Sequence, residues 1–229
     1  MGTGREIRLF EHGFVRLDGA MASDLSVVNS ARVSFAKRKD AMEESDVGLV
    51  GFLMRDRHGT PFEHNAFRFH IRCPLFVARE WMRHRISSFN EESARYHQLE
   101  GDFYVPVVEE VRSQVGKPGA YTFEPVDDAT AESFRTDLAE AYARAYRLYR
   151  EFVDRGVAKE LARCVLPMGT FTQFYWTVNA RSLMNFLSLR NASAAQYEIR
   201  RYAEALETFF AELMPVTHEA FVANGRIAP

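Results

Sequence analysis

The densest polar segment of the chain is RHRISSFNEESARYH at residues 83–97. It opens with Arg83, His84 and Arg85, three side chains that can all be cationic. Adjacent cations repel one another unless an anion lies close by, and the planar guanidinium group binds phosphate oxygens in pairs. The segment therefore favours a binding site for a phosphorylated ligand, with the serine and glutamates downstream available for the sugar hydroxyls or base edge of a nucleotide.

The alternative for the same segment is the solvated start of a helix. Ser88 and Glu91 have the spacing of a capping box, and Glu91 with Arg95 has the spacing of an ordinary ion pair along a helix. A cap does not require Arg-His-Arg before it, so we favour the nucleotide interpretation.

A second polar set belongs to the segment NARSLMNFLSLR at residues 179–190. Leu183, Phe186 and Leu187 form its apolar helical stripe. The polar remainder consists of amides and guanidiniums: Asn179, Arg181, Asn185 and Arg190. Such groups suit base edges and pyrophosphate, whereas Lys and Glu are the usual choice for a solvated face.

A third cluster, RHGTPFEH at residues 57–64, holds two histidines that could bind a metal ion. Neither His58 nor His64 has an acidic or cysteine partner at the usual ligand spacing, so we predict a turn with a cap at Thr60 and no metal site.

The two cysteines are the strongest nucleophile candidates. Cys73 shares the apolar parity of a strand, and Cys164 shares a helical stripe with Val157, Leu161 and Val165. Both are therefore predicted to be buried and structural. Arg163 falls off that stripe and is free to reach a ligand, the alternative being a solvated pair with Glu160.

Several common motifs are missing from the sequence. There is no GxGxxG, GxxxxGK[ST], HExxH, paired ExxH or CxxC. A nucleotide cofactor would thus be held by side chains and not by a glycine loop, and the common zinc and di-iron arrangements are excluded.

The elements that must position these residues are a mixture of helices and fewer strands. Periodicity predicts strands at 7–17 with a turn at Gly13, at 67–73 with alternate apolar residues, and at 171–178. It predicts helices at 24–35, 43–57, 75–82, 134–153, 157–165, 180–190 and 195–213, and another beyond Pro215. Residues 116–121 are predicted to form a surface loop before a helix. The fold class is α+β or mixed α/β, with a small antiparallel sheet flanked by helices.

Composition supports one folded domain over residues 1–229. The chain is 47% hydrophobic and 26% charged, with a net charge of −2, which excludes a disordered chain and a bulk polyanion binder. Two cysteines and no signal peptide or membrane-length apolar run predict a cytoplasmic protein without membrane association. Arginine supplies 25 of the 29 basic residues, a count for which codon usage in a GC-rich genome is the favoured explanation and planar recognition of phosphate or carboxylate the alternative.

These motifs resemble the flavin-dependent thymidylate synthases. The family signature is Arg-His-Arg, seven residues, then Ser, here Arg83–Arg85 and Ser93. The flanks also match, with TPFEH at 60–64, VAREWMRHR at 77–85, NEESARY at 90–96 and TVNARSLMNFLSLR at 177–190. The likeness covers residues 10–220.

The resemblance implies an enzyme that converts dUMP to dTMP with FAD, NADPH and 5,10-methylenetetrahydrofolate in de novo dTTP biosynthesis. It also implies a homotetramer with active sites between subunits. FAD contacts carried over by motif are Ser34, His58, Thr60, Arg83, His84, Arg85, Asn90, Glu91, Asn179, Arg181 and Asn185. Contacts to dUMP carried over in the same way are Glu80, Arg83, Glu91, Ser93, Ala94, Arg95, Arg163 and Arg190.

Two positions depart from the family pattern. Relatives often carry a histidine after the last Arg of the NARSLMNF block, where residues 191–195 read NASAA here, and Glu80 stands where some relatives have Gln. By the same motif match, Arg190 would activate dUMP, since neither cysteine is placed to attack it and a guanidinium beside the pyrimidine favours its ionised form.

Two functions of other classes remain as alternatives. An RNA- or DNA-binding module could use the arginine-rich segment, but the net charge and the absence of RRM, KH or helix-turn-helix patterns disfavour it. An inactive relative that keeps the fold has only the NASAA departure in its favour. The colour of the purified protein separates these alternatives, because a flavoprotein is yellow.

Overall fold

The computed structural model describes residues 4–117 and 119–229. In this part of the chain an antiparallel sheet of five strands has the order β1 (Glu6–Leu9), β2 (Gly13–Met21), β3 (Ala66–Pro74), β7 (Phe171–Asn179) and β4 (Ser88–Glu91). Strand β3 is central and pairs along its whole length with β7, from Ala66 opposite Asn179 to Pro74 opposite Phe171. The alternation predicted for residues 67–73 is confirmed, since Phe67, Phe69, Ile71 and Cys73 are fully buried.

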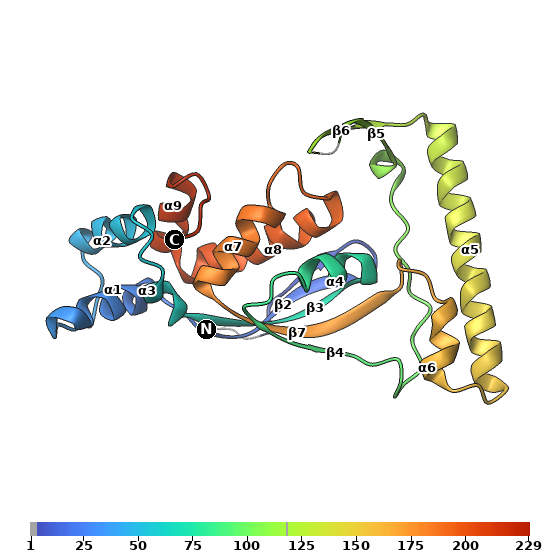
Figure 1. Cartoon of the computed structure of the whole chain (residues 1–229), viewed down its shortest axis with the longest axis horizontal. Helices are drawn as coiled ribbons and strands as arrows, with labels where there is room; N and C mark the ends of the chain where they lie inside the picture. Colours follow the sequence, from blue (N-terminus) through green and yellow to red (C-terminus); the bar gives the residue numbers. More distant parts are fainter. Residues whose placement is uncertain (1–3, 118) are drawn as a thin grey trace.

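Helices cover one face of this sheet, and further helices lie beyond each of its two ends (Figure 1). Helices α4 (Leu75–Trp81), α7 (Ala180–Arg190) and α8 (Tyr197–Leu213) lie over the sheet. At one end are α1 (Asp24–Arg32), the 3₁₀ turn η1 (Val33–Phe35), α2 (Glu44–Arg55), α3 (Thr60–Glu63) and α9 (Pro215–Ala223). At the other end are α5 (Asp128–Asp154), α6 (Lys159–Ala162) and the 3₁₀ turn η3 (Arg163–Val165). One hydrophobic core runs from Leu9 to Phe221.

The strand predicted at 7–17 is a hairpin whose turn lies earlier than expected. Phe10 has a positive φ of 55°, and Gly13 is already the first residue of β2. Gly13 is needed for close packing, because a Cβ there would lie 2.7 Å from the Leu9 carbonyl oxygen and would overlap the Tyr202 hydroxyl.

Two other predictions of local structure were wrong. Residues 88–91 form the edge strand β4, so the capping box predicted as an alternative there does not exist. Of the loop predicted at 116–121, Gly116 and Lys117 belong to strand β5 (Arg112–Lys117), Ala120 and Tyr121 belong to strand β6 (Ala120–Pro125), and residue 118 lies outside the described residues. The two strands pair as a ribbon that follows the 3₁₀ turn η2 (Val108–Glu110). Both strands of the ribbon are largely exposed, so no apolar alternation marks them in the sequence.

The long amphipathic helix is confirmed as α5, but its apolar side is only partly covered. Tyr149 is buried and its hydroxyl accepts a hydrogen bond from the Leu99 backbone N–H at 3.1 Å. Phe134 remains 47% exposed. The helix stands apart from the sheet (Figure 1) and packs against the segment that follows β4 and against α6 and η3.

Candidate functional site

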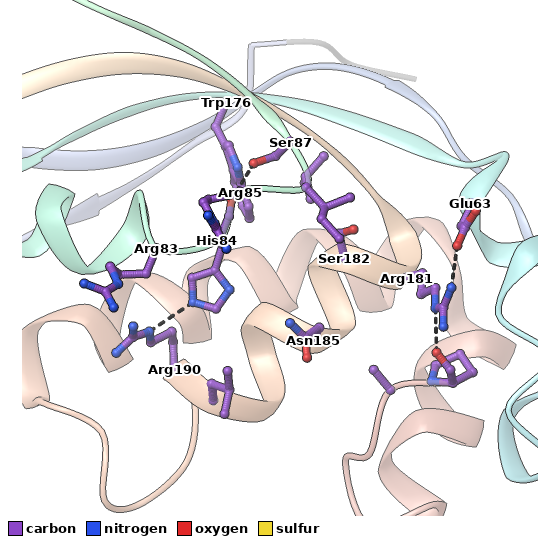
Figure 2. Close-up of a pocket in the computed structure, with 15 residues that line it drawn as sticks. Glu63, Arg83, His84, Arg85, Ser87, Trp176, Arg181, Ser182, Asn185 and Arg190 are labelled. Atoms are coloured by element: carbon purple, nitrogen blue, oxygen red, sulfur yellow. Dashed lines mark hydrogen bonds and ion pairs between the residues drawn. The ribbon is translucent and has the colours of Figure 1, made fainter.

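A cavity of about 550 Å³ lies between α7, the segment that follows α4, and strand β7. Its lining brings together six of the predicted site residues: Arg83, His84, Arg85, Arg181, Asn185 and Arg190. Figure 2 shows Arg83, His84 and Arg190 gathered at one end and Arg181 with Glu63 at the other. Residues nearly a hundred positions apart in sequence therefore share one pocket, of a size suited to a small-molecule ligand.

The lining is strongly cationic. It contains four guanidiniums and one carboxylate side chain, that of Glu63. Within the described residues, the guanidiniums of Arg83 and Arg85 have no ion-pair or hydrogen-bond partner. Arg181 is engaged, because it donates to Glu63 Oε1 at 2.6 Å and to the Pro229 carbonyl oxygen at 2.7 Å. Two unpaired guanidiniums in a cavity are a suitable donor set for phosphate or pyrophosphate oxygens.

Arg190, the last residue of α7, is fixed by three hydrogen bonds. Its Nη1 donates to Glu80 Oε2 at 2.8 Å, its Nη2 to the Glu80 carbonyl oxygen at 3.2 Å, and its Nε to His84 Nε2 at 3.1 Å. Glu80 belongs to α4 and His84 to the segment after it, so the packing of α4 beside α7 orients the guanidinium.

Burial shifts the pKa values of the two side chains that hold Arg190, His84 and Glu80. Desolvation, reinforced by the positive charge of Arg190, lowers the pKa of His84 to about 4. The ring is therefore neutral at pH 7 and able to accept the hydrogen bond from Arg190. Burial also raises the pKa of the Glu80 carboxyl, although the nearby Arg190 opposes the shift.

The cavity also has an aromatic and aliphatic wall that motif reasoning missed. Trp176, Val178 and Leu189 contribute to it. The Trp176 indole N–H is buried without a hydrogen-bond partner in the described part of the chain. An apolar wall next to guanidiniums fits a ligand that combines a planar ring system with phosphates, such as FAD. The signal for Trp176 lay in its shared parity with Phe174 and Val178 on β7, a segment that was interpreted only as a strand. Glu63 stands within the TPFEH block at residues 60–64, but no role was predicted for it.

A second, smaller cavity of about 170 Å³ holds another part of the predicted substrate set. Glu91, Ala94 and Arg163 line it, and Ser93 and Arg95 are adjacent in sequence. Glu91 Oε1 accepts a hydrogen bond from Thr172 Oγ1 at 2.7 Å. The predicted dUMP contacts are thus divided between two cavities of the same chain.

Two side-chain ion pairs that the sequence offered as alternatives to ligand binding are absent from the described ion pairs. Arg95 forms its ion pair with Glu160 at 3.1 Å and not with Glu91, because residues 88–91 are a strand and the helical spacing does not apply. Arg163 donates from Nε to the carbonyl oxygen of Glu160 at 3.3 Å. The solvated side-chain pair of Arg163 with Glu160, given as the alternative, is absent from the described ion pairs, in which Glu160 pairs with Arg95.

The remaining predicted residues lie outside the linings of both cavities. Ser34 is exposed in the 3₁₀ turn η1, and the His58 ring stacks on Phe52 with centroids 5.4 Å apart. Thr60 is the first residue of α3 and Gly59 holds the N-cap position, so the cap expected at Thr60 does not form. Asn90 is exposed on β4.

Asn179 has a structural role that was not anticipated. It is the N-cap of α7, where its Oδ1 accepts a hydrogen bond from the Ser182 backbone N–H at 2.8 Å.

One of the two cysteine predictions was wrong. Cys73 is fully buried, and desolvation raises the pKa of its thiol well above the ordinary value. Cys164 is exposed, because the stripe that carries it faces away from the body of the chain. Neither thiol lines the larger cavity. The described residues contain no group of three or more His, Cys, Asp or Glu side chains suited to a metal ion.

The fold and the cavity define an α+β protein with a cationic ligand pocket. Residues 16–216 match the family described as thymidylate synthase complementing protein. The chain is 47% identical over 218 residues to the flavin-dependent thymidylate synthase of Thermosipho africanus, covering 95% of this chain and 94% of that protein. It is 44% identical over 228 residues to the enzyme of the same name from Streptomyces coelicolor, covering 94% and 93%.

Similarity extends to a solved structure. The UMP/dUMP methylase PolB from Streptomyces cacaoi, bound with 5-Br UMP, superposes with a TM-score of 0.88 at 45% identity, covering 97% of this chain and 99% of that one.

The chain therefore belongs to the thymidylate synthase complementing protein family, whose curated relatives are flavin-dependent thymidylate synthases. The predicted family and fold class are both confirmed. No helix in the described part of the chain is long and apolar enough to cross a membrane.

Proposed function

We propose that this protein methylates dUMP reductively to dTMP. In this reaction 5,10-methylenetetrahydrofolate supplies the one-carbon unit. NADPH supplies a hydride, which passes to the one-carbon unit by way of FAD. The products are dTMP, tetrahydrofolate and NADP⁺, as required for de novo dTTP biosynthesis. Family membership supports the enzyme class and FAD as its cofactor. The name of PolB, a UMP/dUMP methylase, supports a uracil nucleotide as substrate.

The observation that carries the mechanism is the fixed position of Arg190 in a cavity without a thiol. Methylation at C5 of uracil requires electron density at that carbon. A guanidinium held beside N3 and its neighbouring carbonyls stabilises the ionised pyrimidine and so favours attack from C5, with no need for a nucleophile at C6. Glu80 and His84 keep Arg190 in place for this role.

FAD, when bound, supplies the hydride that completes the methyl group. The residues that would hold it include Arg83, Arg85 and Arg181, whose guanidiniums suit the pyrophosphate, and Asn185. Neutral His84 would keep its remaining ring nitrogen available to the ligand. The wider set carried over by motif also includes Ser34, His58, Thr60, Asn90, Glu91 and Asn179.

The division of the predicted dUMP contacts supports an active site built between subunits. Arg83 and Arg190 line one cavity, whereas Glu91, Ala94 and Arg163 line another. A homotetramer would bring the first set of one subunit against the second set of its neighbour and so complete the site.

The test is dTMP formation by the purified yellow protein with dUMP, 5,10-methylenetetrahydrofolate and NADPH. Arg190→Ala should keep its flavin absorbance but lose at least about a hundredfold in turnover, the usual cost of a removed electrostatic group in an active site. Arg8→Ala, which removes an arginine that is 87% exposed on β1, is the matched control. Full activity of Arg190→Ala would overturn the assignment of Arg190. UMP is assayed in parallel, since PolB is named for both nucleotides.

A further inference from the structure

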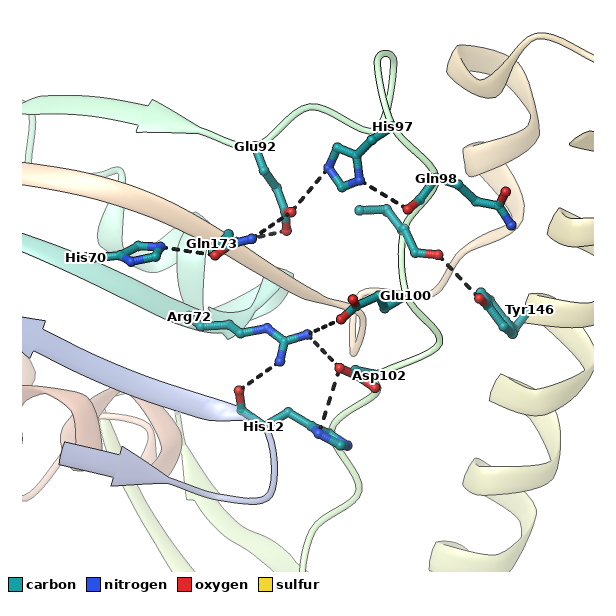
Figure 3. Close-up of polar contacts among 11 residues, drawn as sticks. His12, His70, Arg72, Glu92, His97, Gln98, Glu100, Asp102, Tyr146 and Gln173 are labelled. Atoms are coloured by element: carbon teal, nitrogen blue, oxygen red, sulfur yellow. Dashed lines mark hydrogen bonds and ion pairs between the residues drawn. The ribbon is translucent and has the colours of Figure 1, made fainter. Parts of the chain in front are cut away.

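Glu92 lines the second cavity beside Glu91 and Ala94, but its carboxylate is engaged by Gln173 of β7 and by His97 of the segment that follows β4. It follows directly after β4 and is only 17% exposed. Figure 3 shows its carboxylate between Gln173 and His97. It stands between Glu91 and Ser93, two of the residues proposed to contact dUMP.

Glu92 is attached to β7 by both its backbone and its side chain. Its N–H donates to the Gln173 carbonyl oxygen at 2.9 Å. In return, the Gln173 backbone N–H donates to Glu92 Oε1 at 3.0 Å, and Gln173 Nε2 donates to Glu92 Oε2 at 3.3 Å. A half-buried carboxylate that accepts two N–H groups of one residue fixes that residue firmly.

The carboxylate also sets the orientation of its neighbours. Since it only accepts hydrogen bonds, Gln173 must turn its amide nitrogen toward Glu92 and its Oε1 toward His70 Nε2, 3.0 Å away. His70 is thereby the donor to Gln173. This chain of contacts joins the central strand β3, β7 and the segment after β4.

The same carboxylate closes a turn. His97 Nε2 lies 3.3 Å from Glu92 Oε2, and the backbone N–H groups of Tyr96 and His97 donate to the Ser93 carbonyl oxygen at 3.0 and 3.4 Å. Residues 93–96 therefore form a turn whose two ends meet at Glu92. Ser93, Ala94 and Arg95, all proposed substrate contacts, lie within it.

We infer that Glu92 is a positioning residue that holds the substrate-contacting turn 93–96 against β7. The inference rests on the proposed function, because it takes the ligand of this turn to be dUMP. Glu92 need not touch the nucleotide. Its contribution is to keep Ser93, Ala94 and Arg95 in one arrangement before the nucleotide arrives, so that binding does not have to order them.

The chain offers a sharp test in which hydrogen-bond polarity is exchanged. In Glu92→Gln, the new amide N–H₂ group faces the side-chain N–H₂ group of Gln173, so two donors oppose each other. In Gln173→Glu, the new carboxylate faces the carboxylate of Glu92, so two acceptors oppose each other. In the double variant, the amide introduced at position 92 accepts from the backbone N–H of residue 173. Its two N–H groups donate to the carboxylate introduced at position 173, which still accepts from His70, and to His97 Nε2, whose Nδ1–H is directed to the Gln98 carbonyl oxygen. Each single variant should raise KM for dUMP about tenfold with kcat within about twofold, and the double variant should restore the wild-type KM.

Glu92, Gln173 and Glu100 also line a third cavity, of about 370 Å³. Glu100→Gln is the matched control, because the Glu100 side chain is 80% exposed. It should leave KM unchanged. A wild-type KM in both single variants, or a double variant no better than either single one, would overturn the inference.

A second readout separates this inference from the proposed function. In the holoenzyme without nucleotide, amide hydrogen exchange of residues 93–97 should be about tenfold faster in Glu92→Gln and slow again in the double variant. Unchanged exchange in the single variant overturns the positioning role whatever the reaction catalysed. The two ideas can also fail separately. If exchange is faster in Glu92→Gln and slow again in the double variant, but the wild-type protein makes no dTMP, the proposed function is overturned and the role of Glu92 in holding the turn is supported.

Discussion

Arg190 is prepared for a ligand by the hydrogen bonds it already makes. A guanidinium has five N–H groups, and within the described structure three of those of Arg190 are directed to Glu80 and His84. Two remain for the pyrimidine. Because His84 Nε2 accepts from a permanently charged donor, the proton of the neutral ring must be on Nδ1.

This arrangement predicts how His84 affects stability with pH. The pKa of the ring is near 6.5 in the unfolded chain but only about 4 in the native protein. Between these values the unfolded state binds an additional proton, so stability falls as the pH drops from about 6.5 to about 4. His84→Gln, which keeps an acceptor but cannot titrate, should show a smaller decrease in urea midpoint from pH 7 to pH 5 than the wild type. Identical decreases in both proteins would refute the assignment.

At the scale of elements, a buried carboxylate on α8 joins the end of α7 to α9 and the segment that follows it. Glu207, whose side chain is 10% exposed, accepts from Asn191 Nδ2 at 2.5 Å, from His218 Nε2 at 2.8 Å and from Arg226 at 2.8 Å. Burial alone would raise the pKa of Glu207, but these three donors hold it below the ordinary value. Asn191 follows Arg190 directly, so this junction also supports the end of the helix that carries it.

Glu207→Gln should lower the free energy of unfolding by about 3 kcal/mol, because a half-buried arginine then lacks its charged partner. For a chain of this size the thermal midpoint would fall by roughly 6–12 °C. Glu204→Gln on the same helix is the control. Its side chain is 40% exposed and pairs with Arg200 and Arg201 at the surface, so it should change little. A shift of similar size in both variants, measured by calorimetry, would contradict the role of Glu207.

Elements with a strong apolar period were predictable from the sequence, and those without one were not. Strand β3 alternates buried and outward residues, and α7 and α8 carry clear stripes, so their existence followed from pattern alone. Strand β4 has turn-type residues, SFNE, and becomes a strand only because β7 pairs with it. The arginine lining of the larger cavity was predictable from Arg-His-Arg and NARSLMNF. Its contacts between distant segments, such as Arg181 with Glu63, depend on packing that no local pattern encodes.

For the whole molecule, an apolar stripe that was expected to be buried is open. Val157 is 37% exposed, Leu161 64% and Val165 40%, and Met168 nearby is 46% exposed. We propose that this cluster belongs to the subunit interface of the proposed homotetramer. The stripe lies in the segment that also carries Arg163, which lines the second cavity. A neighbouring subunit of the proposed homotetramer would therefore bury the stripe and complete the active site in one contact.

Leu161→Asp should consequently weaken assembly and activity together. A carboxylate buried against an apolar partner surface costs several kcal/mol, enough to shift a tetramer toward smaller species at micromolar concentration. Sedimentation velocity should show the loss of the tetramer, circular dichroism should show an intact fold, and dTMP formation should fall in proportion to the tetramer that remains. Val222→Asp, at a residue 43% exposed on α9, serves as the control and should keep both mass and activity. A Leu161→Asp protein that sediments as the wild type does would place the interface elsewhere, whereas a smaller protein with full activity would show that one chain contains the whole site.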